Sequence, residues 1–256
     1  MSSPIKIYLK KFQSMNLKYY LKNTSNLLLK LFKYNLKIIF ANKFIYFLLS
    51  AIAFFIFVTI ITVNDADTNP TEAMVYYLLL FPGILLIFYP TVFGIQNDAD
   101  AQILEILFTI PNYRYKVWLV RMVMIYILVF LIMSCLSFLC SLALVEFSVF
   151  GMVYQLMFPV FFIGSLAFMI STIIRNGFGT VVAMVIIGIT LWISRNFPFL
   201  ENTKWDVFLN PFSLPSGIND AVWADIVFNN RIYLSAGILL CILSGLLNLQ
   251  KREKFI

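Results

Sequence analysis

Long apolar runs alternate along the chain with short polar stretches, and the runs are long enough to cross a membrane. A membrane-crossing helix needs roughly 20 apolar residues, because each residue adds about 1.5 Å of length. The stretch 122–174 holds a single charged residue, Glu146, and is too long for one helix, so we divide it there. The pattern predicts six transmembrane helices, at 44–63, about 73–95, 122 to about 145, about 147–174, 178–194 and 232–249.

Composition supports this interpretation. The chain has 256 residues, of which 61% are hydrophobic and only 12% are charged, whereas soluble domains carry roughly 25% charged residues. This excludes a soluble globular enzyme and predicts an all-α integral membrane protein. There is no His, and Cys135, Cys140 and Cys241 lie inside apolar runs. We therefore expect neither a disulfide framework nor a metal site, and no cofactor bound by this chain itself.

The distribution of Lys and Arg predicts the orientation. With the N-terminus inside, sixteen of the nineteen basic residues fall on the cytoplasmic side of the predicted helices, as the positive-inside rule requires. Only Arg195, Lys204 and Arg231 fall outside. Both termini are then cytoplasmic, including the tail 251–256. The net charge of +7 is a sign of this topology, and we expect no nucleic-acid partner.

The first 43 residues contain nine Lys and no acidic residue. Lys30, Lys33 and Lys37 share one helical face, and apolar residues that include Leu31 and Phe32 occupy the opposite one. That pattern is typical of an interfacial helix on anionic lipid headgroups, so membrane lipids are expected partners. We expect residues 1–43 to be a cytoplasmic, interfacial segment and residues 44–250 to form the six-span domain.

The predicted spans contain almost no ionisable residues, although ion-coupled transporters and proton pumps place such residues at membrane depth. Glu146 is expected in the turn between the third and fourth spans rather than in a buried relay. Without His for a zinc site or a Ser–His dyad, the chain is not expected to be an enzyme by itself. Gly237, Cys241 and Gly245 recur every four residues, which predicts close helix packing along the sixth span.

The most informative segment, 97–121, follows the second span. Acidic residues open it, an amphipathic helix follows, Pro111 breaks that helix, and basic residues precede the next span. An acidic start and a basic end suit the helix dipole. A loop that only joins two spans would be the simpler explanation.

This segment resembles the signature of ABC-2-type transporter permeases, in which an E-x-E-x-G-T-L-E-L-L-x-x-x-P-x-x-R run follows the second span. The sequence departs from that signature at Gln102 and Ile103, which stand where the family usually has Gly and Thr. The matching residues are Asp98, Asp100, Leu104, Glu105, Ile106, Leu107, Pro111 and Arg114.

The resemblance extends to the architecture. Family members have an N-terminal interfacial helix, six spans, both termini inside and a long external segment before the last span. Here that segment is 195–231, and 209–212 resembles the family's Asn-Pro-aromatic feature. The resemblance implies short helices that dip back from outside within this segment.

The resemblance implies the permease subunit of an ATP-driven exporter with a cytoplasmic coupling helix at 98–116. The chain has no G-x-x-x-x-G-K-[ST] motif, so ATP would be bound by a separate ABC ATPase subunit that acts through Glu105. Two permeases would pair, as a homodimer or a heterodimer. In relatives the first, second and fifth spans line the route. Here these are apolar and aromatic, which favours an amphiphilic cargo such as a peptide, an antibiotic or a lipid-linked molecule.

Two other function classes remain open at this stage. A non-transporting scaffold or sensor subunit would share the composition but would need no ATPase. An ATP-independent channel or carrier is disfavoured by the lack of intramembrane charges and of an inverted repeat. The abundance of Phe, Ile, Lys and Asn is typical of an AT-rich bacterial genome, so a bacterial cell membrane is the expected location.

Overall fold

The computed structural model describes residues 44–64, 70–100, 113–197 and 200–249. These residues form six helices and no strand. Each helix is long and apolar enough to span a membrane, which indicates a multi-pass membrane protein and confirms the all-α prediction. The helices are α2 (Phe44–Asn64), α3 (Glu72–Asp100), α5 (Tyr113–Ala143), α6 (Val149–Ile174), α7 (Gly177–Ser194) and α8 (Asp220–Leu249).

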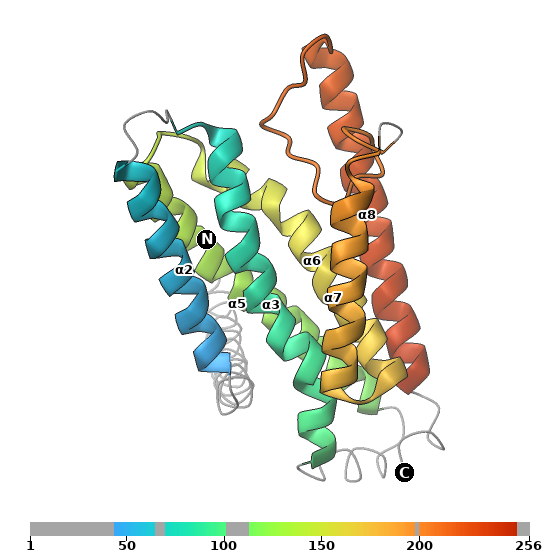
Figure 1. The fold of residues 1–256 in the computed structure, drawn as a ribbon. Helices are drawn as coiled ribbons and strands as arrows, with labels where there is room; N and C mark the ends of the chain where they lie inside the picture. Colours follow the sequence, from blue (N-terminus) through green and yellow to red (C-terminus); the bar gives the residue numbers. More distant parts are fainter. Residues whose placement is uncertain (1–43, 65–69, 101–112, 198–199, 250–256) are drawn as a thin grey trace, which may run out of the picture. The chain divides into compact units, whose positions relative to one another are not determined.

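Successive helices run in opposite directions, so the helix ends gather at two opposite ends of the bundle (Figure 1). We call the end that carries residues 195–219 the distal end. The opposite end, where α3 ends and α5 begins, is the proximal end. The expected interfacial segment 1–43 and the tail 251–256 lie outside the described residues. The orientation of the termini therefore stays a prediction.

Helices α3 and α6 form the centre of the packing. Helix α3 contacts α2, α5, α6 and α7, and α6 also contacts α8. A Cβ added at Gly164 of α6 would lie 2.4 Å from Ile87 Cδ1 of α3, so the two helices approach closely at this glycine. The Ser171 hydroxyl donates to the Val92 carbonyl oxygen at 2.8 Å and joins the same two helices near the proximal end.

The small-residue face of α8 is confirmed as a packing surface. Gly237 lies against Phe162 of α6, and Gly245 lies against Phe168, with an added Cβ 2.7 and 2.6 Å from the two rings. Cys241 between them is buried. Small residues allow the two helices to come close without any need for polar contacts.

Glu146 lies where the sequence predicted, exposed in the short connection between α5 and α6. Helix α6 begins directly afterwards, because the Ser148 side chain accepts a hydrogen bond from the backbone N–H of Gly151. An N-cap of this kind satisfies one of the free amides of the first helical turn.

Several predicted helix boundaries were wrong. Helix α8 begins at Asp220, twelve residues before the predicted start at Ile232, so the irregular part of the segment 195–231 is 195–219. The described residues of that part form turns and not the short helices that the resemblance implies. At the proximal end α3 continues to Asp100 and α5 starts at Tyr113, so both take up residues assigned to the coupling helix 98–116.

The longer helices also contain ionisable residues that we had placed outside the spans. Arg121 lies in α5 and Arg231 in α8, and both are buried. The guanidinium carbon of Arg121 lies 4.5 Å from the ring centroid of Trp118. The predicted spans began one residue after each of these arginines, and the helices continue past both.

Candidate functional site

The residues of the predicted coupling segment stand at the proximal end. Asp98 and Asp100 are in the last turn of α3, and Arg114 is in the first turn of α5. Asp100 is exposed. Because α3 and α5 pack against each other, these ends belong to one helical hairpin. The remaining predicted residues, Leu104, Glu105, Ile106, Leu107 and Pro111, lie outside the described residues, and their role stays a prediction.

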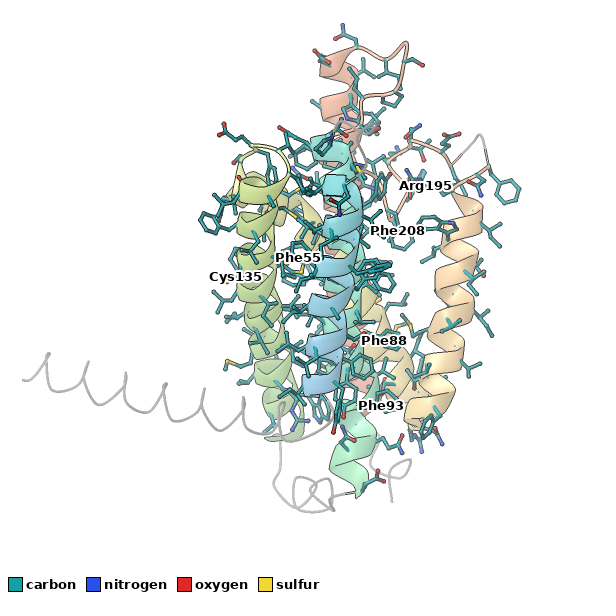
Figure 2. The ribbon with its side chains drawn as sticks, turned by 60° about the vertical axis from the view of Figure 1, so that its left-hand side comes forward. Phe55, Phe88, Phe93, Cys135, Arg195 and Phe208 are labelled. Atoms are coloured by element: carbon teal, nitrogen blue, oxygen red, sulfur yellow. The ribbon has the colours of Figure 1, made fainter. Side chains whose placement is uncertain are left out.

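Four aromatic side chains link α2, α3 and α7 towards the proximal end. Phe47 of α2 lies 4.8 Å from Tyr89 of α3, measured between ring centroids. Tyr89 lies 5.3 Å from Phe93, which is one turn further along α3 (Figure 2). Phe93 meets Phe178 of α7 edge-on at 5.9 Å. We call Phe47, Tyr89, Phe93 and Phe178 the aromatic row.

Helix α7 is attached to α3 at this end by a polar contact as well. The Gln96 side-chain oxygen accepts a hydrogen bond from the backbone N–H of Gly177 at 2.6 Å. A Cβ added at Gly177 would lie 2.4 Å from Phe93 Cδ1, so glycine permits this close approach. The buried residues of α7 are Gly177, Thr180 and Met184, all in its proximal half.

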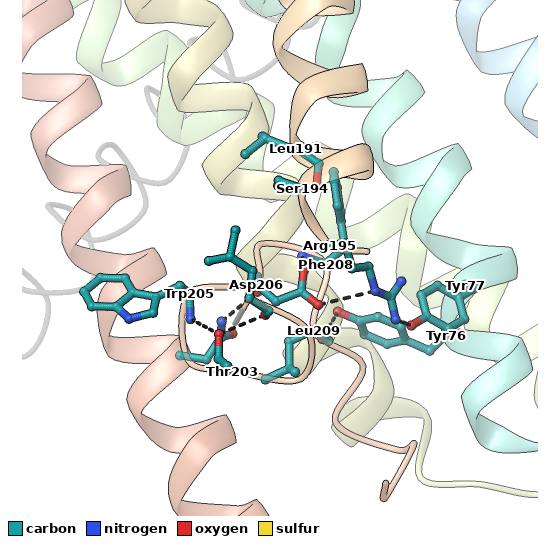
Figure 3. Close-up of polar contacts among 12 residues, drawn as sticks. Tyr76, Tyr77, Leu191, Ser194, Arg195, Thr203, Trp205, Asp206, Phe208 and Leu209 are labelled. Atoms are coloured by element: carbon teal, nitrogen blue, oxygen red, sulfur yellow. Dashed lines mark hydrogen bonds and ion pairs between the residues drawn. The ribbon is translucent and has the colours of Figure 1, made fainter. Parts of the chain in front are cut away.

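At the distal end α7 is held by Arg195 and by a ring contact of Trp192 with Phe208, whose centroids lie 6.3 Å apart. Arg195, which follows the last residue of α7, donates from its guanidinium to the Tyr77 hydroxyl of α3. Its Nε lies 3.4 Å from the Asp206 carboxylate in the segment 195–219. Figure 3 shows the guanidinium between these two partners. We call Tyr77, Arg195 and Asp206 the distal clamp.

Asp206 is the most deeply buried member of the distal clamp, with 2% of its side chain exposed against 24% for Arg195. Burial raises the pKa of this carboxyl above its ordinary value, because the charged form loses hydration. The backbone N–H of Phe208, at 2.9 Å from Oδ1, and the charges of Arg195 and Arg231 oppose the rise but do not cancel it. The ion pair is therefore sensitive to acid.

A second buried guanidinium, that of Arg231, organises the same segment. Its Nε donates to the Gln155 side-chain oxygen of α6 and its Nη1 to the Asn230 side-chain oxygen, both at 2.8 Å. Its Nη2 lies 3.4 Å from the Leu209 carbonyl oxygen, which also accepts from the Tyr76 hydroxyl at 3.2 Å. Arg231 thus joins α6, α8 and the segment 195–219.

The Asn-Pro-aromatic feature fastens the segment to α3 and α8. The Asn210 amide donates to the Ala73 carbonyl oxygen at 2.9 Å, and its side-chain oxygen accepts from the Phe212 N–H at 3.0 Å. The Trp223 indole N–H donates to the Pro211 carbonyl oxygen at 3.1 Å. Residues 195–219 are therefore anchored to the helices rather than loosely attached.

Sequence reasoning missed the distal clamp and the Arg231 contacts, although one signal was available. Arg195, Lys204 and Arg231 are the three basic residues that the orientation count leaves on the external side. All three have specific partners here, since Lys204 Nζ lies 5.6 Å from both the Trp205 and the Tyr233 ring centroids. Basic residues that depart from the positive-inside rule thus indicated residues with a structural role.

The contacts described above hold the helices against one another. Within the described residues no group of three or more Cys, Asp or Glu could hold a metal ion. Comparisons with protein-family models, with curated proteins and with solved structures find no match to this chain. The function is therefore inferred from the geometry and from the resemblance in the segment 97–121.

Proposed function

We propose that this chain is the permease subunit of an ATP-driven exporter similar to ABC-2-type transporters, with ATP hydrolysed by a separate subunit at the proximal end. The observation that carries the proposal is where the matched motif falls. Asp100 ends α3 and Arg114 lies in the first turn of α5, so the motif spans the proximal turn of a packed helical hairpin. A force applied to that turn would act directly on α3, the central helix.

The helices that correspond to the expected route have the surface for an amphiphilic cargo. In α2 and in α7, only 17% of the apolar 18-residue stretch is buried inside the structure. Large apolar side chains are exposed along both helices, among them Phe57 at 64% and Ile186 at 60%. The aromatic row joins these two helices through α3. These surfaces favour a peptide, an antibiotic or a lipid-linked molecule over a sugar or a metal ion.

The geometry suggests how the route would open. Helices α3 and α6 interdigitate and would move as one body, because close packing resists relative sliding. Helix α7 has no buried residue in its distal half, so the distal clamp is its main attachment there. Pro82 and Pro90 allow α3 to bend. ATP-driven motion at the proximal end would strain the distal clamp and separate α7 from α3.

The proposal includes a second permease, identical or different, and a bacterial cell membrane as the location. The exposed faces of α2 and α7 are where a second six-helix subunit would complete the route. The non-transporting scaffold shares all of these surfaces. It differs in needing no ATPase at the segment 101–112.

Affinity purification of the full chain from its host in mild detergent, followed by mass spectrometry, tests the proposal. We expect an ATPase subunit with a G-x-x-x-x-G-K-[ST] motif to be retained. Glu105→Ala should lower its retention, since a charge-assisted hydrogen bond typically contributes about 1.5–3 kcal/mol. Glu146→Ala, at an exposed acidic residue of the distal end, is the matched control. Partners without any ATPase would favour the scaffold instead.

A further inference from the structure

Two hollows lie along the junction of α6 and α8, and no residue of α2, α3 or α7 lines them. The inner hollow has a volume of about 430 Å³ and is lined almost wholly by apolar side chains, which include Phe130 of α5, Met157 and Phe161 of α6, and Ile238 of α8. The outer hollow, about 400 Å³, lies towards the distal end and is more polar.

Arg231 stands between the two hollows and touches a wall of each. Its guanidinium carbon lies 5.5 Å from the ring centroid of Phe158, which lines the inner hollow. Its Nε donates at 2.8 Å to Gln155, which lines the outer hollow. Arg231 itself is only 6% exposed. The two hollows are therefore parts of one track that is interrupted by a buried positive charge.

The spacing along α8 supports a single track. Residues three or four apart share one face of a helix, and the residues of α8 that line the hollows follow this spacing together with Arg231. In order from the distal end they are Asp220, Trp223, Ala224, Val227, Arg231, Ser235, Ile238 and Leu239.

The charge of Arg231 has neutral hydrogen-bond partners. Its contacts are the Gln155 and Asn230 side-chain oxygens and the Leu209 carbonyl oxygen. In the described part of the chain no carboxylate lies within 4.0 Å of it, and Asp206 interacts with it only at longer range. A buried charge without an ionic partner is costly, so an anionic group beside it would be stabilised.

The inner hollow also has the right depth for an acyl chain. From Arg231 to Leu239, the last wall residue of the inner hollow on α8, a helix rises about 12 Å. One leaflet of a bilayer has a hydrocarbon depth of about 15 Å. A cation at headgroup level above an apolar groove matches a phospholipid, which carries its phosphate directly above its acyl chains.

We propose that this track is a binding site for one phospholipid of the leaflet at the distal end. Its acyl chain fills the inner hollow, and its phosphate lies at the level of Arg231. The Asp220 carboxylate lies eleven residues away, about 16 Å along the helix, and leaves the phosphate at Arg231 without a close like charge on this face of α8. This site goes beyond the proposed function and does not depend on whether the chain transports anything.

Photolabelling of the full chain in vesicles tests the site. The probe is a phosphatidylglycerol with a diazirine on its acyl chain, and labelled residues are mapped by mass spectrometry. We expect labelling of Met157, Phe161 and Ile238 that saturates with probe and is competed by unlabelled phosphatidylglycerol. It should exceed labelling of Leu139 by about tenfold, or about 1.4 kcal/mol. Leu139 is 50% exposed on α5, on a face that the proposed route does not use.

Two variants separate the acyl chain from the headgroup. Ser235→Phe fills the inner hollow and should lower labelling of Ile238 about tenfold, whereas Leu139→Phe on the exposed face of α5 should leave it unchanged. Arg231→Gln should abolish the preference for phosphatidylglycerol over a neutral diacylglycerol probe while the hollow still labels. Thermal unfolding of each variant checks that the fold is kept.

Labelling of the hollow that does not saturate and equals that of Leu139 would mean bulk lipid only and would overturn the proposal. Exclusion of the probe by cross-links between two copies through α6 and α8 would overturn it as well, because a second subunit would be the occupant. If Ser235→Phe does not fold, competition on the parent chain decides alone.

Discussion

Helices α3 and α7 differ in how deeply they are buried and in which contacts hold them in the bundle. In α3, 67% of the apolar 18-residue stretch is buried inside the structure, whereas in α7 the corresponding share is 17%. Helix α3 is held along its whole length by contacts such as Gly83 against Val160 and Gly164 against Ile87. Helix α7 is held mainly at its two ends, by Gln96 at one end and by Arg195 with Trp192 at the other. Packing thus makes α3 a rigid centre, and terminal polar contacts leave α7 able to move.

A glycine pair gives the largest contrast between these regions. Gly164→Leu should destabilise the fold by about 1–3 kcal/mol or more, because its side chain would collide with the buried Ile87. Gly188→Leu on α7 should be close to neutral, since no described atom lies within 4 Å of an added Cβ there. Thermal unfolding in detergent measures both variants. Equal losses would contradict the division into a rigid centre and a mobile flank.

The next largest effect is expected at the distal clamp. Arg195→Gln removes the ionic partner of the buried Asp206 carboxylate and should cost about 1–3 kcal/mol, towards the lower value because Arg195 is partly exposed. The loss should appear as faster amide exchange in residues 186–194 and not in α3. Lys204→Gln, which removes an exposed cation from the same segment, is the control. Uniform faster exchange in all helices would refute a local clamp.

Asp206→Asn should have the smallest effect on stability, because the amide oxygen can still accept from the Phe208 N–H. It tests the pH dependence of the clamp. Since burial raises the pKa of Asp206, the folded state binds its proton more tightly than the unfolded chain does. The contribution of this group to stability is therefore fully present below about 3.9, the ordinary value, and decreases as pH rises through the raised pKa.

Acidification through that window should therefore break the Arg195–Asp206 ion pair without unfolding the protein. We expect the protection factors of the amides in 186–194, which correct for the intrinsic pH dependence of exchange, to fall in the parent chain as the pH falls. Those of the Asp206→Asn variant should stay constant and already low. A parent chain whose exchange in 186–194 shows no such step would contradict the assigned role of the carboxyl group.

The helices could be predicted because a span leaves a long, contiguous signal. Glu146 correctly marked the turn before α6. The predicted start of α8 was too late because the apolar run begins only after the last charge, Arg231, although a helix start signal lies before it. The Asn219 side-chain oxygen accepts from the Ala221 N–H at 3.2 Å, and Asp220 lies in the first turn, where a negative charge suits the helix dipole.

The contacts of the distal end could not be predicted in the same way. Tyr77 and Arg195 are 118 positions apart in sequence, and neither residue type nor spacing indicates that they meet. Only the exceptional external position of Arg195 and Arg231 pointed to them. The aromatic row was equally hidden, because the chain holds 27 Phe and 13 Tyr and their pairing depends on how the helices cross.

The central claim, ATP-driven movement of an amphiphile coupled through the proximal end, is tested most directly in proteoliposomes. These would contain the full chain with its copurified ATPase and a fluorescent amphiphilic peptide. We predict ATP-dependent movement of the peptide that is lost in Glu105→Ala, while ATP hydrolysis continues and Glu146→Ala transports like the parent. Movement that does not need ATP, or that proceeds unchanged in Glu105→Ala, would contradict the account.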